Sequence, residues 1–269
     1  MTVETVILKY LEQGEGEPVV LIHDAFSDHR VWEAQCEAVV ARGYRFIAPD
    51  LRYHGDTPWT DDGAKYSLAI HTSDVAEFIR QLDAGPVHVV GWSYGSNVSL
   101  VLAAQYPELV RSLVLYEPAF DPIVSNPDDL ETLGKEWGSN GAFAASQAGD
   151  QEEAVRLFAD WITEPSGSFE ALEPSFRTVL LENSRTLPLL FASPPDPPIT
   201  CDQIGQITMP VTVVKGEQTR PAFVIYSDTA HECIPDSQVV TTPDATHLAP
   251  YENPTAFNEV VLSHLERTD

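Results

Sequence analysis

Residues 91–95 read Gly-Trp-Ser-Tyr-Gly, and they join an apolar run at residues 87–90 to a helix-like stretch over residues 97–106. A strand that turns sharply into a helix needs small residues on both sides of the turn, so that the residue between them can adopt a strained backbone. Such a turn lifts the Ser93 hydroxyl clear of the sheet, where a base and a substrate can reach it. The strand before the motif and the helix after it make the pattern specific, since the five letters alone occur by chance.

The composition is that of a globular protein with a large excess of acidic residues. The chain has 269 residues, 43% of them hydrophobic, which is enough to bury a sizeable core. Its formal net charge is −26, from 41 acidic and 15 basic residues. Phosphate recognition requires basic patches, so we expect no nucleic-acid partner. Residues 121–200 carry 14 acidic and 4 basic residues, and this bias favours neutral over anionic substrates.

Compartment signals and cysteine usage point to a cytoplasmic protein. No apolar stretch approaches the length of a membrane span, and the first residues lack the basic and apolar regions of a signal peptide. The three cysteines, Cys36, Cys201 and Cys233, are widely spaced and form no CxxC motif. This argues against a disulfide framework and against a zinc site. Cys36 falls on the apolar stripe of an expected helix, which favours a small buried hydrophobe.

Short apolar strands alternate with helices towards both ends of the chain. This rhythm predicts a parallel sheet that is covered by helices on both faces. Strands are expected at residues 6–10, 19–22, 44–48, 87–90, 113–116, 211–214 and 239–242. Helices are expected at residues 30–42, after a cap at Ser73, and at residues 97–106, 221–233 and 254–265.

The rhythm breaks over residues 118–208. This stretch holds helix-like patterns and a proline-rich passage at residues 194–198, but no clear strand. We therefore predict a core built from residues 1–117 and 209–269, with the remainder inserted between two strands. Ligand sites in such sheets form at the carboxyl ends of the strands. The insertion is expected to cover these ends as a helical lid.

Four short motifs make the chain resemble the α/β-hydrolase superfamily over nearly its full length. They are His23-Asp24-Ala25, the stretch at residues 50–55, the Ser93 turn, and Ala245-Thr246-His247 followed by Glu252-Asn253-Pro254. The family usually has His-Gly in the first motif and Asp-x-Arg-Gly-x-Gly in the second, so Asp24 and Tyr53 depart from its pattern. The resemblance implies a mostly parallel eight-stranded sheet flanked by helices, and acyl-transfer chemistry. We expect neither a cofactor nor a metal.

A serine hydroxyl becomes a good nucleophile only when an adjacent base takes its proton. The resemblance places this base at His247, which follows the last expected strand and precedes the final helix. The family most often orients its histidine with an aspartate three residues after Gly216, but that position here is Thr219. We expect Glu117 to be the acid, at the end of the strand that follows the nucleophile's strand, with Glu217 as the alternative. Zearalenone-type lactone hydrolases look similar in this placement of the acid.

Acyl transfer also needs hydrogen-bond donors aimed at the oxyanion of its tetrahedral intermediate. The backbone N–H groups of Tyr94 and Ala25 are expected to supply them, the first at the positive end of a helix dipole. Asp24 stands beside this site. We expect its carboxylate to point away from the oxyanion and to form hydrogen bonds within its own loop.

Aromatic residues near the serine and in the insertion suggest an apolar pocket. They are Trp92, Trp137, Phe143, Phe158 and Trp161. The sequence therefore predicts a serine hydrolase that cleaves a neutral, fairly apolar carboxylic ester or lactone through an acyl-enzyme. The residues that we assign to substrate binding are Asp24, Trp92, Trp137 and Trp161.

Two other functions fit the same residues. Cofactor-free dioxygenases of N-heteroaromatic rings also resemble the chain; they use a histidine with a carboxylate after the strand that follows the turn, and their serine only helps to bind substrate. A non-catalytic small-molecule receptor is the second, since some hormone receptors of this family keep a vestigial triad. Dehalogenase and epoxide-hydrolase chemistry is disfavoured, because those branches need an aspartate in place of Ser93.

Overall fold

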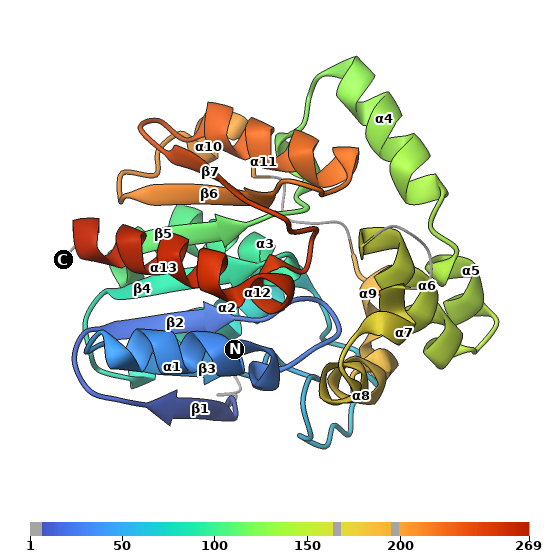
Figure 1. The fold of residues 1–269 in the computed structure, drawn as a ribbon, viewed down its shortest axis with the longest axis horizontal. Coiled ribbons are helices and arrows are strands. Elements are labelled where there is room, and N and C mark those ends of the chain that lie inside the picture. The colour runs from blue at the N-terminus through green and yellow to red at the C-terminus, as the bar shows by residue number, and fades with distance from the viewer. Residues whose placement is uncertain (1–6, 164–167, 195–198, 269) are drawn as a thin grey trace.

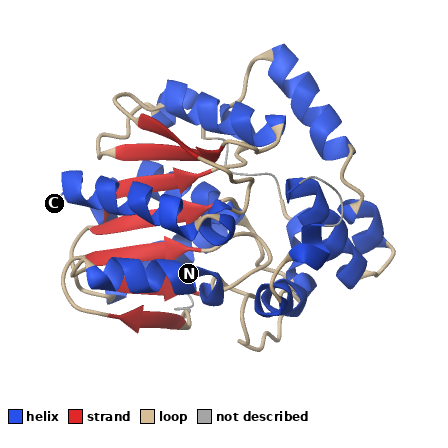
Figure 2. Ribbon diagram, in the orientation of Figure 1, coloured by secondary structure: helices blue, strands red, loops and turns tan. Residues whose placement is uncertain are grey.

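The protein is built around one mostly parallel sheet. A computed structural model describes residues 7–163, 168–194 and 199–268. Its seven strands follow the order β1-β3-β2-β4-β5-β6-β7, in which β1 alone runs antiparallel to its neighbour (Figure 1, Figure 2). The α/β class and the mostly parallel sheet are therefore confirmed. The strands are β1 Tyr10–Gln13, β2 Pro18–Ile22, β3 Arg45–Pro49, β4 Val87–Trp92, β5 Val110–Tyr116, β6 Val211–Gly216 and β7 Gln238–Thr242.

Two expectations about the strands are wrong. The resemblance implied eight strands, whereas the described residues form seven, as many as the apolar runs of the sequence. The first strand also begins later than expected, at Tyr10. Ile7 is 83% exposed, and residues 1–6 lie outside the described part of the chain. Because β1 is an edge strand and exposes most of its residues, it lacks the buried pattern by which the other strands are recognised.

The central strands bring their carboxyl ends to one edge of the sheet. Every residue of β2 and β4 is buried, which explains their continuous apolar runs. The parallel register pairs Ile22 with Gly91, Trp92 with Tyr116, and Tyr116 with Val214. The loops that follow β2, β4, β5 and β6 therefore start side by side. This edge is where side chains from distant parts of the sequence can meet.

Helices cover both faces of the sheet. In Figure 1, α1 Glu33–Ala41 and α13 Pro254–Thr268 lie in front of the strands, while α3 Tyr94–Gln105 lies behind them and packs against α2 Leu68–Gln81. Helix α11 Pro221–Cys233 packs against β6 and has the bounds expected from the sequence. Among the helices of the described residues, none is long and apolar enough to cross a membrane.

The cap predicted for α2 is wrong. Ser67 begins this helix, and its side chain accepts a hydrogen bond from the Ile70 N–H at 3.2 Å. Ser73 lies in the helix interior. The apolar stripe of α2 starts about two turns before Val75, where the stripe used for the prediction begins, because Leu68 is buried as well. Two serines at nearly helical spacing can both look like caps, and only the burial of the first turn separates them.

The described part of residues 118–208 is helical and contains no strand. It leaves the sheet after β5 and returns at β6. In Figure 1 its helices before residue 195 lie beyond the carboxyl ends of the strands, whereas residues 201–204 lie beside α11. Residues 195–198 of the expected proline-rich passage lie outside the described residues. The helices of this insertion are α4 Pro127–Gly138, α5 Ala142–Gln147, α6 Gln151–Thr163, α7 Ser168–Ala171, α8 Pro174–Glu182, α9 Leu187–Phe191 and α10 Cys201–Ile204.

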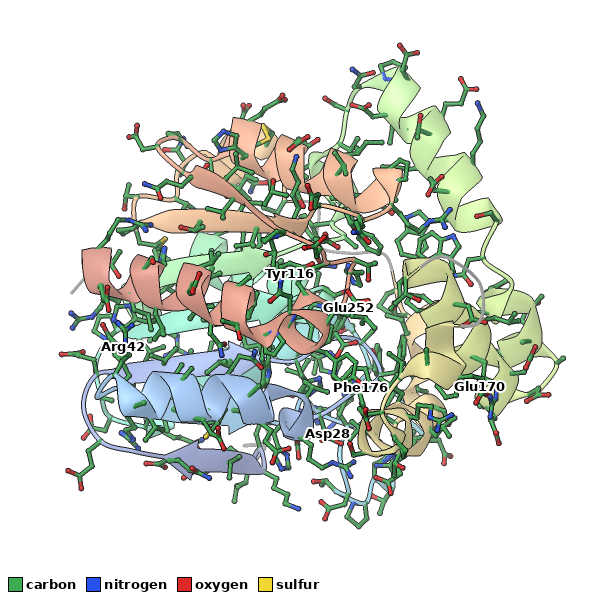
Figure 3. The ribbon with its side chains drawn as sticks, in the orientation of Figure 1. Asp28, Arg42, Tyr116, Glu170, Phe176 and Glu252 are labelled. Carbon is green, nitrogen blue, oxygen red and sulfur yellow. A yellow bond between two sulfur atoms is a disulfide. The ribbon has the colours of Figure 1, made fainter. Side chains whose placement is uncertain are left out.

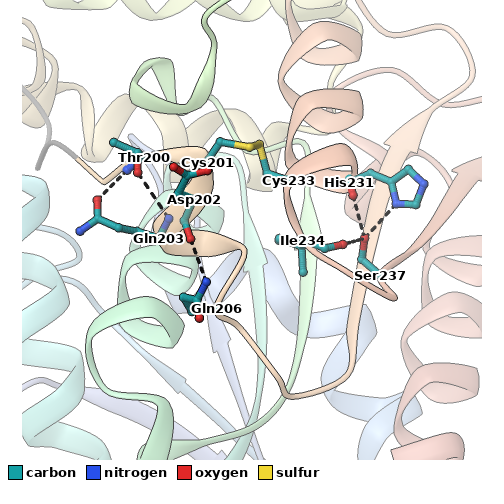
Figure 4. Close-up of a disulfide and its surroundings, with 9 residues drawn as sticks. All are labelled: Thr200, Cys201, Asp202, Gln203, Gln206, His231, Cys233, Ile234 and Ser237. Carbon is teal, nitrogen blue, oxygen red and sulfur yellow. Dashed lines mark hydrogen bonds between the residues drawn. A yellow bond between two sulfur atoms is a disulfide. The ribbon is translucent and has the colours of Figure 1, made fainter.

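The cysteines contradict the expectation that the chain forms no disulfide. Cys201 and Cys233 are bonded, with their Cα atoms 5.1 Å apart (Figure 4). Cys201 begins α10 and Cys233 ends α11, so the bond ties the last helix of the insertion to a helix of the core. The two residues are 32 positions apart and meet only because α10 packs on α11, which their spacing could not reveal. Cys36 is free and buried, as predicted.

Removing this bond with the double variant Cys201→Ser and Cys233→Ser should lower the free energy of unfolding. Closing a 32-residue loop restricts the unfolded chain, which is worth about 3–4 kcal/mol in the chain-entropy model. Denaturant unfolding of the oxidised, the reduced and the doubly substituted protein measures the effect. Cys36→Ala is the control that removes a thiol without touching the bond. Three free thiols in the unfolded, non-reduced protein would contradict the pairing.

His264 should make the fold sensitive to acid. Burial, reinforced by the Arg267 charge, lowers the pKa of His264 to about 3, against about 6.5 in an unfolded chain. Between these values the unfolded state binds a proton that the folded state does not, so stability is lost as the pH falls below about 6.5. At pH 5, His264→Gln should remove about 2 kcal/mol of the acid-induced loss. Urea unfolding at pH 7.5 and pH 5 tests this, and equal losses in both proteins would contradict it.

Candidate active site

The Ser93 turn has the strained geometry that the sequence predicts. Ser93 lies between β4 and α3 with φ +53° and ψ −116°, a conformation that costs a non-glycine residue on the order of 1–3 kcal/mol. A Cβ on Gly91 would lie 2.6 Å from the Gly95 carbonyl oxygen, and one on Gly95 would lie 2.1 Å from that of Ile22. The motif therefore reflects a close backbone approach on both sides of the serine.

A buried hydrogen bond joins His247 to Glu117. The distance from His247 Nδ1 to Glu117 Oε2 is 2.5 Å, and the two side chains are 3% and 0% exposed. Glu117 follows β5 directly. Its Oε1 accepts the Gly216 N–H at 2.7 Å, and its Oε2 also accepts the Thr219 hydroxyl at 2.9 Å. Three donors thus satisfy a carboxylate that is closed off from water.

The alternative acid does not reach the histidine. Glu217 is exposed, and its Oε2 accepts the backbone N–H of Asp244 at 3.1 Å. Thr219, at the position where the family usually has its aspartate, donates to Glu117 instead of carrying a charge. The structure thus brings Glu117, and not Glu217, to His247.

The loop that carries His247 is held at several points. The Phe223 ring stacks on the imidazole, with ring centroids 3.7 Å apart and planes 15° apart. Trp92 Nε1 donates to the His247 carbonyl at 2.9 Å. The Glu252 carboxylate, labelled in Figure 3, accepts both the N–H and the hydroxyl of Thr246, the preceding residue. These contacts fix the plane of the ring and the path of the loop.

The two peptide groups around Ala25 are also fixed. The Asp24 carbonyl accepts from His23 Nδ1 at 2.8 Å, and the Ala25 carbonyl lies 2.7 Å from His54 Nε2. Tyr94 is the first residue of α3, so its N–H has no partner within the helix. Ala25 and Tyr94 line the same cavity as the serine. Both predicted oxyanion donors therefore come from backbone that adjoins this cavity.

The carboxylate of Asp24 forms its hydrogen bond within its own loop, as expected. It is buried and accepts from the Ser27 hydroxyl. Burial raises the pKa of Asp24, and the Ser27 hydrogen bond opposes this effect. Asp24 is absent from the lining of the cavity beside Ser93. Its assignment to substrate binding does not fit this position, because its carboxylate is already engaged inside the loop.

A cavity of about 280 Å³ adjoins Ser93, and its lining includes one of the three tryptophans that we assign to substrate binding from the sequence. Trp137 lines this cavity. Trp92 is fully buried and supports the histidine loop instead. Trp161 packs against Trp137, with ring centroids 4.7 Å apart, and is absent from the cavity lining. Aromatic composition alone could not separate rings that face a cavity from rings that pack against each other.

The cavity wall also includes residues that the sequence did not single out. Asp121 lies four residues after Glu117, and Tyr226 lies on α11. Tyr226 follows Phe223 by three residues, a spacing that places both on one face of the helix and could have indicated it. No pattern pointed to Asp121. The remaining additions are Asn97, Ala119, Leu190, Phe191 and Ser193.

A larger cavity, of about 670 Å³, lies away from these groups. Its lining includes Phe176, labelled in Figure 3, and Tyr251, whose rings stack with centroids 4.1 Å apart. Neither Ser93 nor His247 lines it. Cavity size therefore does not locate the chemistry in this protein. We place the candidate site where a strained serine, a paired histidine and the backbone N–H groups of Ala25 and Tyr94 converge.

One group of described side chains is spaced closely enough to bind a metal ion, but each of these side chains is already engaged in hydrogen bonds. Ligand atoms of Asp28, His29 and Asp50 lie within 4.8 Å of one another. His29 Nδ1 is bonded to Asp50 at 2.7 Å. Although burial raises the pKa of Asp28, hydrogen bonds from Arg30 and Asn183 hold it well below its usual range. Because a guanidinium already occupies the Asp28 carboxylate, we assign no metal to this group (Figure 3).

Fold and site together match one family. The model of the Alpha/beta hydrolase family matches residues 19–260. The chain therefore belongs to the alpha/beta hydrolase family, and it is an enzyme of this hydrolase class. Its exact branch within the family, including the zearalenone-type branch, is not fixed by this match.

Individual proteins resemble the chain only at low sequence identity. A Bacillus subtilis protein named "Putative 2-succinyl-6-hydroxy-2,4-cyclohexadiene-1-carboxylate synthase" is 26% identical over 273 residues, covering 96% of this chain and 95% of that protein. Esterase Rv0045c of Mycobacterium tuberculosis is 33% identical over 104 residues, which are 39% of this chain and 34% of that protein. The esterase EaEST of Exiguobacterium antarcticum superposes with a TM-score of 0.79 at 20% identity, covering 96% of this chain and 95% of that one.

Gly95→Ala should destabilise the protein because the new Cβ has no space. It would lie 2.1 Å from the Ile22 carbonyl oxygen, and such overpacking costs about 1–3 kcal/mol. Gly134→Ala is the matched control. Gly134 lies in α4, and apart from its chain neighbours and the backbone of its own helix, no atom lies within 4 Å of the point that its new methyl group would occupy. This change should therefore stabilise the helix by about 0.5–1 kcal/mol. Denaturant unfolding of both variants measures the difference, and equal effects would contradict the close approach at the turn.

Proposed function

We propose that the chain is a serine hydrolase that cleaves a neutral, fairly apolar carboxylic ester or lactone through an acyl-enzyme. The observation that carries this proposal is the buried hydrogen bond between His247 Nδ1 and Glu117 Oε2, at the strand ends beside the Ser93 turn. With Nδ1 engaged, Nε2 is the nitrogen that can take the proton of the serine hydroxyl. The adjoining cavity then receives the substrate.

In the proposed reaction, Ser93 Oγ attacks the carbonyl carbon of the ester while His247 Nε2 takes the hydroxyl proton. The carbonyl oxygen becomes an oxyanion, to which the N–H groups of Ala25 and Tyr94 donate. Collapse of this intermediate breaks the bond to the alcohol, which leaves with the proton from the imidazolium. Water then attacks the acyl-enzyme by the same route and restores the serine. Glu117 keeps the proton on Nδ1 and stabilises the charged ring.

The proposed reaction also requires a hydrogen bond between the nucleophile, Ser93, and the base, His247. In the described structure, no hydrogen bond joins the Ser93 hydroxyl to the His247 ring. Catalytic hydrogen bonds often tighten only when substrate is bound. Phe223 already fixes the plane of the ring. We therefore expect the serine hydroxyl to complete the arrangement when substrate fills the cavity.

The cavity wall supports a small and largely apolar substrate. The large apolar residues of this wall are Trp137, Phe158, Leu190 and Phe191. The described residues of the wall include no lysine or arginine. Its volume of about 280 Å³ is close to the lower limit of about 300 Å³ for ligand pockets. All four apolar residues come from the insertion. We accordingly take residues 118–208 to be a lid over the strand ends.

A cofactor-free dioxygenase of N-heteroaromatic rings is the second candidate. The paired His247 and Glu117 fit its requirements equally, and the missing hydrogen bond to Ser93 favours it, because its serine only helps to bind substrate. The two reactions differ in what Ser93 does. A hydrolase forms a covalent acyl-enzyme on this residue, whereas the dioxygenase consumes oxygen with a hydroxyquinolone and keeps activity without the serine.

Labelling with a fluorophosphonate, followed by a panel of esters and lactones, tests the proposal. We expect the probe to modify Ser93, and we expect Ser93→Ala to abolish both the labelling and the hydrolysis. Circular dichroism of the variant checks that the fold is retained. Oxygen uptake with a hydroxyquinolone in Ser93→Ala would instead support the dioxygenase. Absence of labelling and of every turnover would leave the small-molecule receptor. A cytoplasmic location stays a prediction.

Glu117→Gln should reduce turnover far more than Glu217→Gln. The amide cannot balance the charge of the imidazolium or fix its tautomer, and such a loss can lower kcat by about 10⁴-fold. Glu217 binds only the Asp244 backbone, so its variant should stay within about threefold of the natural protein. Steady-state kinetics on one activated ester compares them. The reverse order of effects would show that the acid is wrongly assigned.

A further inference from the structure

The cavity wall contains a polar cluster that the proposed reaction does not use. Tyr226, on the same face of α11 as Phe223, donates its hydroxyl proton to the Asp121 carboxylate. Trp137 Nε1 donates to the Tyr226 oxygen at 3.0 Å. All three residues line the cavity beside Ser93. This chain of hydrogen bonds runs from Trp137 through Tyr226 and ends on a carboxylate.

The direction of these bonds decides what the cavity offers to a ligand. The tryptophan proton goes to the tyrosine, and the tyrosine proton goes to Asp121. The Asn97 side chain is paired with Ala119 in both directions, because one amide N–H donates to the Ala119 carbonyl at 2.9 Å and Oδ1 accepts the Ala119 N–H at 2.8 Å. An ionised carboxylate can only accept hydrogen bonds. Away from the serine and the oxyanion donors, the cavity is therefore rich in acceptor capacity.

The charge of this wall is not compensated. Asp121 is an exposed residue, and no hydrogen bond to its second carboxylate oxygen is formed within the described residues. Among the described residues that line the cavity there is no lysine or arginine. The whole chain carries a net charge of −26, which adds to the negative potential at this wall. A carboxylate on the ligand would be repelled here, whereas a cation or a hydrogen-bond donor would be attracted.

We propose that Asp121, held in place by Tyr226, is a specificity site for substrates with an apolar body and a hydrogen-bond donor at the end remote from the ester, best an ammonium group. This inference rests on the proposed hydrolase function and extends its substrate class beyond neutral esters to esters with a cationic remote end. The ester carbonyl lies at Ser93, the apolar body contacts Trp137 and Phe158, and the donor end meets the Asp121 carboxylate. Esters that carry a remote carboxylate are poor substrates.

Three p-nitrophenyl esters of similar length test the proposal: the 6-aminohexanoate, the heptanoate and the adipate monoester. Their kcat/KM values are divided by their uncatalysed rates to remove intrinsic reactivity. We expect the ammonium ester to exceed the carboxylate ester by about tenfold or more, the effect of a hydrogen bond to a charged group. Asp121→Asn should reduce this ratio to within about threefold. Tyr226→Phe should lower the ratio as well, mainly through KM of the ammonium ester.

Asp129→Asn is the matched control. It removes the same charge from a partly exposed residue of the neighbouring α4, outside the cavity lining, and should leave the ratio unchanged. Hydrolysis that depends on Ser93, with one ratio shared by the natural protein and Asp121→Asn, would overturn this inference alone. Equal loss of the ratio in Asp129→Asn would also overturn it, because the effect would then be one of net charge.

A binding measurement keeps the two proposals separate. Trp137 lies in the cavity wall, so tryptophan fluorescence can follow titration with hexylammonium and with hexanoate. We expect hexylammonium to bind about tenfold more tightly, and Asp121→Asn to remove this preference. If no ester is hydrolysed but the preference is found, the proposed function fails and the specificity site stands. If neither ligand binds preferentially, the specificity site is refuted whatever the activity.

Discussion

A buried carboxylate needs hydrogen-bond donors that stabilise its negative charge. In this fold, the site depends on the buried carboxylate of Glu117. Its donors are Gly216 at the end of β6, Thr219 in the next loop, and His247 after β7. They converge only because β5, β6 and β7 are adjacent and end at matching heights in a parallel register. A slip of one residue would move alternate side chains to the opposite face and leave the carboxylate unpartnered.

Helix α11 connects this constraint to the wall of the cavity. Phe223 stacks on His247, Tyr226 binds Asp121, and Cys233 ties the helix to the returning end of the insertion. The base, the cavity wall and the insertion therefore share one support. A movement of α11 would displace the imidazole and the Asp121 carboxylate together, so selection of the substrate and activation of the nucleophile depend on the same packing.

Local patterns predicted the features that local physics determines. The continuous apolar runs indicated the central strands, and the two glycines indicated the turn at Ser93, because each depends on residues within a few positions. Contacts between distant residues were beyond such patterns. Tyr226 meets Asp121 across 105 positions, and Cys233 meets Cys201 across 32. Glu117 was placed through the family resemblance together with its position at the end of the strand next to the nucleophile's strand.

The hydroxyl of Thr219 explains how the acid can stand on β5 rather than after β6. An aspartate at Thr219 would put a second carboxylate within hydrogen-bond distance of Glu117, where the two like charges could not both stay ionised at low cost. Thr219 instead donates at 2.9 Å and helps to hold the single charge that His247 requires. The two positions are therefore coupled. A carboxylate directly after β5 favours a neutral hydrogen-bond donor at position 219. An aspartate at position 219 would instead favour an uncharged residue at position 117.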